Sequence, residues 1–239
     1  MSLSWDGTGH AYVNCSAGTL GAAGTGDYTM VVLMRPTDTS NGGPLSLWSG
    51  SVTGTEVRQI MGDTGKWFGE NDFSSGFGGW TTNTWYMLGQ SKVAGTNDYR
   101  WHLWAYASDG SGTKTHTTGT SAAGDGSAIA AVRLGDTNLR YNYGEVAVAA
   151  VWKRVLSDAD FVSLCTNTAS SFMSLGTGAP DALWLCNVAS PASIVDATGN
   201  GANAASVSGS AVTGSGVDPP SYSYTLSSPS AIPAPWLKF

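Results

Sequence analysis

The stretch Gly144–Thr166 changes its apolar periodicity halfway along, and this constrains the fold more than any other part of the 239 residues. In its first half, apolar residues alternate with smaller or polar ones, as in a strand. The sequence therefore predicts a strand inside a sheet, with one strongly apolar face made of Val146, Val148, Ala150 and Trp152.

A short helix is predicted directly after this strand. Ser157 is its expected N-cap, because Asp160 follows at the spacing of a capping box. Phe161, Leu164 and Cys165 recur at helical spacing and predict its buried face. The chain should thus pass from a buried strand into one helix.

Other strands are predicted by short apolar runs between Gly, Asn, Asp and Ser clusters. The dipeptide Asp6-Gly7, with a short apolar run on each side, is a strong β-hairpin signal. The continuous apolar run that ends at Pro36 predicts a strand buried on both faces. Residues 71–80 are expected to form a surface loop, and the remaining strand candidates are residues 44–48, 56–61, 66–68, 84–91, 99–106 and 132–135.

The order of these segments resembles that of laminin-G-like and concanavalin A-like jelly-roll domains. The resemblance begins with Trp5-Asp6-Gly7, which is followed by Ala11-Tyr12-Val13. It continues with the predicted strand at 27–36. It ends with Val132-Arg133-Leu134-Gly135, which precedes the stretch Gly144–Thr166. It covers residues 2–166. It implies an all-β, two-sheet antiparallel jelly-roll sandwich with one short helix and an extended C-terminal arm.

Three parts of the chain are expected. Residues 1–166 should form the laminin-G-like sandwich, and residues 167–216 a β-rich extension packing on it. The extension holds a strand candidate at 182–186, a turn at 196–201 and a weak edge strand at 204–213. Residues 217–239 hold five of the nine prolines and predict an extended arm that needs a surface to lie on.

Charge and composition exclude several partners. The formal net charge of −6 disfavours binding to nucleic acid, which depends mainly on Lys and Arg. The longest apolar run, Val146–Trp152, is far too short to span a membrane, and MSLSWDGTG has no signal-like region. The three cysteines favour reduced, buried thiols, with a Cys165–Cys186 disulfide left open.

Catalysis is not expected. A glycosidase on this fold would need two carboxylates at a defined separation, and Glu56, Glu70 and Glu145 are isolated in the sequence. Asp158 and Asp160 are explained by helix capping. No catalytic or cofactor-binding motif occurs, and no cofactor is expected; a bound calcium at the loop aspartates is left open without named ligands.

Aromatic residues are the candidate binding groups. Because side chains alternate along residues 101–106, Trp104 and Tyr106 share one strand face and could line a glycan groove with Trp80 or Trp85. The alternative is that these large side chains fill the core. A carbohydrate-binding, lectin-type module is therefore one functional hypothesis.

The resemblance favours another hypothesis, because such a domain with a proline-rich arm is similar to virion proteins of tailed bacteriophages. It implies a non-enzymatic structural protein, such as a capsid decoration or tail protein, made in the host cytoplasm and located in the virion. Its partners would be capsid or tail subunits or copies of itself, with cell-surface glycans as further candidates. The expected docking residues of the arm are Tyr222, Tyr224, Trp236 and Phe239.

Overall fold

The fold is seen in a computed structural model of the chain. The structure describes residues 2–7, 11–24, 26–39, 41–49, 56–63, 66–68, 74–78, 80–96, 98–106, 112–120, 128–136, 142–166, 172–186, 188, 190–209 and 212–213. The predicted arm at 217–239, with Tyr222, Tyr224, Trp236 and Phe239, lies outside the described residues.

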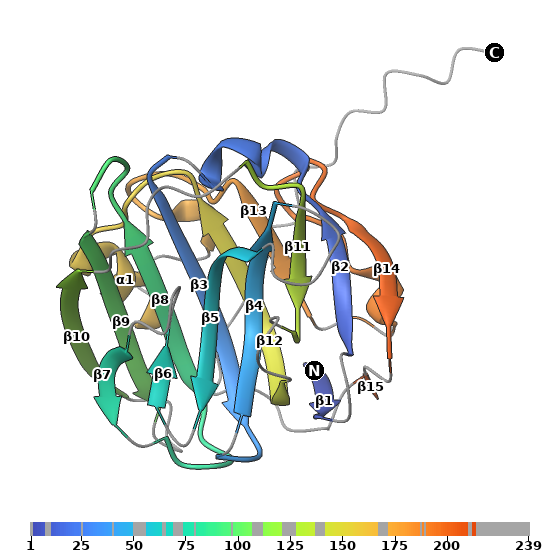
Figure 1. Ribbon diagram of the computed structural model, residues 1–239, viewed down its shortest axis with the longest axis horizontal. Helices are drawn as coiled ribbons and strands as arrows, with labels where there is room; N and C mark the ends of the chain where they lie inside the picture. Colours follow the sequence, from blue (N-terminus) through green and yellow to red (C-terminus); the bar gives the residue numbers. More distant parts are fainter. Residues whose placement is uncertain are drawn as a thin grey trace.

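Two antiparallel sheets face each other as a sandwich (Figure 1), which confirms the predicted fold class. Sheet A has the order β10 (Gly112–Thr120), β9 (Asp98–Tyr106), β8 (Tyr86–Lys92), β3 (Tyr28–Pro36), β12 (Tyr143–Trp152), β1 (Leu3–Asp6) and β15 (Val212–Thr213), and β13 (Ala182–Leu185) also pairs with β12. Sheet B has the order β14 (Ala204–Ser208), β2 (Tyr12–Ser16), β11 (Ala131–Leu134), β4 (Asn41–Trp48), β5 (Glu56–Asp63), β6 (Lys66–Phe68) and β7 (Ser74–Gly78).

Four short helices are described. The α-helix α1 spans Asp158–Cys165, and the 3₁₀ helices are η1 (Gly18–Gly24), η3 (Phe172–Ser174) and η4 (Pro191–Ser193). No helix in the described part of the chain is long and apolar enough to cross a membrane.

Apolar side chains are buried on both faces of sheet A. The main core lies between the two sheets, and a second cluster lies on the outer face of sheet A, where it includes Phe161 and Leu164 of α1. All nine residues of β3 are buried, because this strand contributes to both clusters. The prediction of a strand buried on both faces is therefore confirmed.

Helix α1 begins as predicted. The Ser157 side chain accepts a hydrogen bond from the backbone N–H of Asp160, and the Asp160 carboxylate accepts one from the backbone N–H of Ser157, which completes the capping box. Phe161, Leu164 and Cys165 are buried. A Cβ at Gly89 would lie 2.8 Å from the Phe161 ring, so glycine there lets the helix lie close to the sheet.

The alternation predicted for β12 is wrong at one point. The register of β12 against β3 shifts between Val146 and Val148, so a β-bulge interrupts the strand. As a result Val146 faces the main core, while Val148, Ala150 and Trp152 belong to the outer cluster. The four residues therefore do not share one face.

Two further predictions are wrong. The strands on either side of Asp6-Gly7 do not form a hairpin, because β1 pairs with β12 in sheet A and β2 pairs with β11 and β14 in sheet B. The expected surface loop at 71–80 contains strand β7, which pairs with β6. Strand β10, rich in threonine, was not predicted at all.

The three cysteines are free thiols, so the Cys165–Cys186 disulfide does not form. Cys165 belongs to the outer cluster, while Cys186 and Cys15 lie in the main core on the other side of sheet A. Burial, with Asp196 as a smaller cause, raises the pKa of the Cys15 thiol to about 12, so this thiol is neutral at physiological pH.

The predicted extension contributes strands to both sheets. β13 pairs with β12 in sheet A, and β14 pairs with β2 in sheet B. The Asp196 carboxylate accepts hydrogen bonds from the backbone N–H groups of Leu183, Thr198 and Ala202, which ties the turn between the two strands to β13. Trp184 of β13 is fully buried in the main core. The boundary drawn at residue 166 remains a prediction.

Candidate functional site

Three of the four predicted glycan-binding residues gather on the outer face of sheet A. Trp85, Trp104 and Tyr106, here called the aromatic cluster, all belong to or pack against the outer apolar cluster. The backbone N–H of Tyr106, at the end of β9, donates to the carbonyl of Trp85, which directly precedes β8, at 3.0 Å. This bond holds the two residues side by side. The ring centroids of Trp104 and Tyr106 are 6.3 Å apart.

The members of the aromatic cluster differ in exposure. Trp104 is partly exposed, whereas Trp85 and Tyr106 expose 6% and 5% of their surface. The Tyr106 hydroxyl donates to the carbonyl of Cys165 at 3.3 Å, so this ring is fixed against the end of α1. Trp104 is thus the member that a ligand reaches most directly.

Two hydrogen-bond donors of the aromatic cluster are unused. The indole N–H groups of Trp85 and Trp104 are buried and have no hydrogen-bond partner within the described structure. A buried donor without an acceptor is costly, and such groups call for an explanation. The Trp104 ring also lies against Gly112 of the edge strand β10, where a Cβ would collide with the indole.

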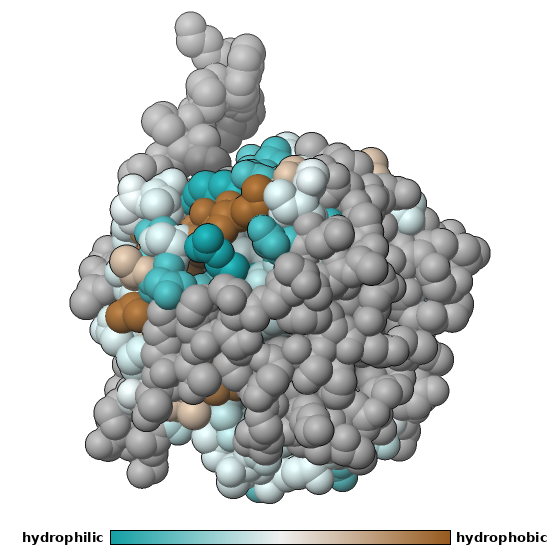
Figure 2. Space-filling view, turned by 60° about the vertical axis from the view of Figure 1, so that its left-hand side comes forward, coloured by the Kyte–Doolittle hydropathy of each residue, from teal (hydrophilic) through white to brown (hydrophobic). Residues whose placement is uncertain are grey.

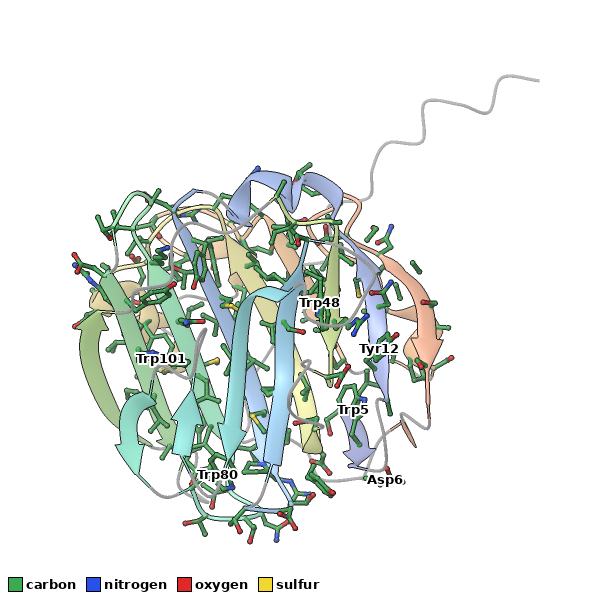
Figure 3. All side chains as sticks on the ribbon, viewed as in Figure 1. Trp5, Asp6, Tyr12, Trp48, Trp80 and Trp101 are labelled. Carbon is green, nitrogen blue, oxygen red and sulfur yellow. The ribbon has the colours of Figure 1, made fainter. Side chains whose placement is uncertain are left out.

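Trp80 is not part of this cluster. It lies in the main core between the sheets, where it exposes 5% of its surface, and its indole N–H donates to the carbonyl of Asp38 at 3.0 Å. Figure 3 labels Trp80 at the lower end of the sandwich. Its side chain therefore lies on the other side of sheet A from Trp104.

The buried carboxylates of the described residues have structural partners. Glu145 exposes 1% of its surface and accepts two hydrogen bonds of 2.9 Å from the Arg35 guanidinium, which also donates to Asn83. Asp160 caps α1, and Asp196 holds the turn before β14. Each of these three carboxylates therefore has a contact that stabilises the fold.

His102 packs inside the fold. His102 is buried, stacks on Phe161 with ring centroids 4.8 Å apart, and has Nδ1 3.4 Å from Asp158 Oδ1. This packing places it between sheet A and α1. Among the described residues no group of three or more His, Cys, Asp or Glu side chains could hold a metal ion. A calcium site in the loops stays a prediction.

A second group of side chains, which the sequence analysis missed, lies on the outer face of sheet B. Arg133 of β11 has its guanidinium carbon 4.2 Å from the ring centroid of Tyr12 and 3.7 Å from that of Trp48. We call Tyr12, Arg133 and Trp48 the cation–aromatic stack. Strand alternation was a usable signal, because Val132 and Leu134 face the main core and Arg133 must then face outwards.

Exposed apolar surface is scattered on the described part of the molecule. The large apolar side chains classed as exposed are Val93, Met173, Val195 and Val207, which belong to different elements. On the face shown in Figure 2, the brown patches are small and lie among hydrophilic or intermediate residues. Single exposed apolar residues are normal and need no partner.

Comparisons with known proteins give partial matches of low sequence identity. No protein-family model and no curated protein sequence matches the chain. Among solved structures it is similar to a Trypanosoma rangeli sialidase in complex with 2,3-difluoro-KDN, at 12% identity and a TM-score of 0.48 over 69% of this chain and 27% of the sialidase. The chain therefore matches about a quarter of that protein's length.

Two further matches have similarly low sequence identity. The CBM40 module of the Ruminococcus gnavus IT-sialidase, bound to alpha2,3 sialyllactose, is 15% identical with a TM-score of 0.46 over 69% of this chain and 95% of the module. Domains LG4-5 of the mouse laminin alpha1 chain are 13% identical with a TM-score of 0.43 over 63% of this chain and 40% of that chain. The jelly-roll fold expected from the resemblance agrees with the two antiparallel sheets of the structure.

Proposed function

We propose that this protein is a non-enzymatic module that binds glycans through the aromatic cluster. The observation that carries the proposal is that Trp85, Trp104 and Tyr106 gather on one sheet face, where Trp104 is partly exposed. Aromatic rings offer an apolar face to the C–H side of a sugar. The partly exposed Trp104 is the expected stacking residue.

The state of the carboxylates supports a binding role over hydrolysis. Glycoside hydrolysis needs two carboxyl groups that flank the scissile bond, one of them free to donate a proton. In the described structure Glu145 is neutralised by Arg35, and Asp160 and Asp196 accept hydrogen bonds from backbone N–H groups. Using any of them in catalysis would break a contact that holds the fold.

Trp104→Ala is expected to weaken glycan binding at least about tenfold, since an aromatic residue at the centre of a site commonly contributes more than about 1.4 kcal/mol. The measurement is a glycan array on the wild type, followed by calorimetric titration of the best ligand against the variant. The matched control is Val207→Ala, which removes an exposed apolar group at the far edge of sheet B.

Tyr106 needs a milder substitution than alanine, because its buried ring would leave a cavity. Tyr106→Phe removes only the hydroxyl that donates to Cys165 and should leave glycan affinity within about twofold if the ring acts by packing. The proposal fails if no glycan on a broad array binds the wild type, or if Trp104→Ala and Val207→Ala bind equally well.

A second function, attachment to a virion, is favoured by the composition of residues 217–239. Prolines pre-set an extended backbone and so reduce the entropy lost on docking, while Tyr222, Tyr224, Trp236 and Phe239 supply apolar area. Extended proline-rich segments bind by laying such side chains into grooves. The partners would be capsid or tail subunits or other copies of this chain.

Deleting residues 219–239 is therefore expected to leave a folded protein whose melting temperature is almost unchanged, but which no longer enters its particle. The reason is that burial of a few aromatic side chains, at about 25 cal/mol per Å², contributes enough for attachment without being needed by the sandwich core. Thermal unfolding and quantification of the protein in purified particles provide the measurement. Unfolding of the truncated protein would identify the arm as an internal strap, and normal incorporation would place attachment elsewhere.

A further inference from the structure

The cation–aromatic stack on the outer face of sheet B has the features of a second binding site. Arg133 on β11 lies opposite Asn14 on β2 and Ser46 on β4 in the strand register. Tyr12 on β2 and Trp48 on β4 lie on the two strands that pair with β11, and Figure 3 labels both. The site lies on the opposite outer face of the sandwich from the aromatic cluster.

The geometry restricts what Arg133 can bind. The guanidinium carbon lies 4.2 Å from the Tyr12 ring centroid and 3.7 Å from that of Trp48, while its N–H groups point outwards in the guanidinium plane. A planar acceptor with two oxygens matches such an edge, because it accepts two parallel hydrogen bonds. A carboxylate has this shape.

The Arg133 guanidinium has few hydrogen-bond acceptors around it in the described structure. It exposes 9% of its surface, and its hydrogen bond among the described residues is a long one of 3.4 Å, from Nη1 to Asp136 Oδ2. Its Nε–H is buried and has no partner there. A buried cationic donor with an unused N–H is costly unless an acceptor is supplied, and a bound ligand would supply it.

The surroundings of Arg133 are fixed before any ligand binds. The Trp48 indole N–H donates to Ser46 Oγ at 2.7 Å, and the Ser46 hydroxyl donates to the carbonyl of Asp136 at 2.7 Å. These bonds hold one ring of the stack in place and attach the Asp136 segment to β4. Preorganisation of this kind lowers the entropy lost on binding.

The accessible side of the stack is polar and aromatic. Tyr12 and Asn14 are half-buried, so both can be reached from solvent beside the buried Arg133. A tyrosine ring suits the C–H face of a sugar, and an amide suits its hydroxyl groups. The Asp136 carboxylate partly offsets the charge of Arg133, which favours a ligand with one negative charge over a phosphate with two.

We propose that the cation–aromatic stack binds a carboxylate-bearing sugar, such as a hexuronic acid residue, whose carboxylate accepts hydrogen bonds from Arg133. Tyr12 packs on the sugar ring and Asn14 bonds its hydroxyl groups. This site shares no residue with the aromatic cluster, so a test of one proposal does not decide the other.

The test is a titration of the full-length protein with glucuronic acid and with glucose, followed by the NMR signals of the Arg133 Nε–H and the Asn14 side-chain amide. Glucuronic acid should shift both signals and bind at least tenfold more tightly than glucose, which has the same ring without the carboxylate. Arg133→Gln should abolish the preference, and Arg133→Lys should restore little of it because an ammonium lacks the planar fork. Val93→Ala, at an exposed position outside both proposed sites, should leave it unchanged.

Three outcomes would overturn the proposal: no shift with glucuronic acid, equal binding of glucose, or a preference that survives Arg133→Gln. Circular dichroism on each variant establishes that it is folded. If Arg133→Gln fails to fold, the variant Asn14→Ala, at a half-buried position, is used in its place. It should lower the affinity for glucuronic acid at least threefold. An unchanged affinity would contradict the proposal.

Discussion

Arg35→Met is expected to lower the free energy of unfolding by about 3–5 kcal/mol, because it leaves the Glu145 carboxylate buried without its cation. Glu145 exposes 1% of its surface and takes both of its short hydrogen bonds, 2.9 Å each, from this one guanidinium. The pair lies in adjacent strands β3 and β12, directly opposite each other in the register. Removing one partner therefore costs much more than an exposed ion pair would.

The matched variant is the double substitution Arg35→Met with Glu145→Leu. Replacing both charges by apolar groups of similar volume removes the unpaired charge, so most of the lost stability should return, to within about 2 kcal/mol of the wild type. Urea unfolding of the wild type, both single variants and the double variant gives the coupling energy. A single-variant cost below about 1 kcal/mol would mean that water or another group already solvates Glu145.

Local signals in the sequence predicted local structure well. The capping box of Ser157 and Asp160, the buried face of α1 and the doubly buried strand β3 all depend on neighbouring residues, and all are present in the structure. Capping and periodicity act within one or two turns of chain, so they can be read without knowing what packs against the segment.

Strand partners and interruptions could not be predicted in the same way. Alternation tells which residues share a face, but it does not tell which strand lies alongside, so β1 and β2 were assigned to one hairpin although they belong to different sheets. The bulge at β12 inverts the face of every residue beyond it, and no residue type at Ala147 announces it. Both errors have the same cause, since pairing is decided by contacts distant in sequence.

The candidate sites show the same limit. Alternation correctly separated Trp104 and Tyr106 from Trp101. Trp80 was grouped with them wrongly, because a residue in the connection between two strands, here β7 and β8, gives no sign of which side of the sheet it will occupy. Arg133 could have been found, because its two neighbours are apolar and face inwards. Its position between Tyr12 and Trp48 depends on three strands that only the fold brings together.

Trp152→Ala is the other substitution with a large expected effect, a loss of about 3–5 kcal/mol from the free energy of unfolding. Trp152 is fully buried in the outer cluster and stacks on Phe172 of η3, with ring centroids 6.1 Å apart. Its indole N–H also donates to the carbonyl of Gly178 at 3.4 Å. Alanine would leave a cavity between sheet A and the segments that cover it.

Urea unfolding of the variant should show the loss as a lower midpoint with an unchanged slope, because the outer cluster is expected to unfold together with the main core. Trp152→Phe keeps a ring against Phe172 and should lose less, about 1–2 kcal/mol. Val93→Ala, at an exposed position, is the control and should change the stability by less than about 0.5 kcal/mol. If Trp152→Ala instead costs under about 1 kcal/mol while the midpoint of the main transition stays constant, α1 and η3 form a cover that separates from sheet A before the sandwich unfolds.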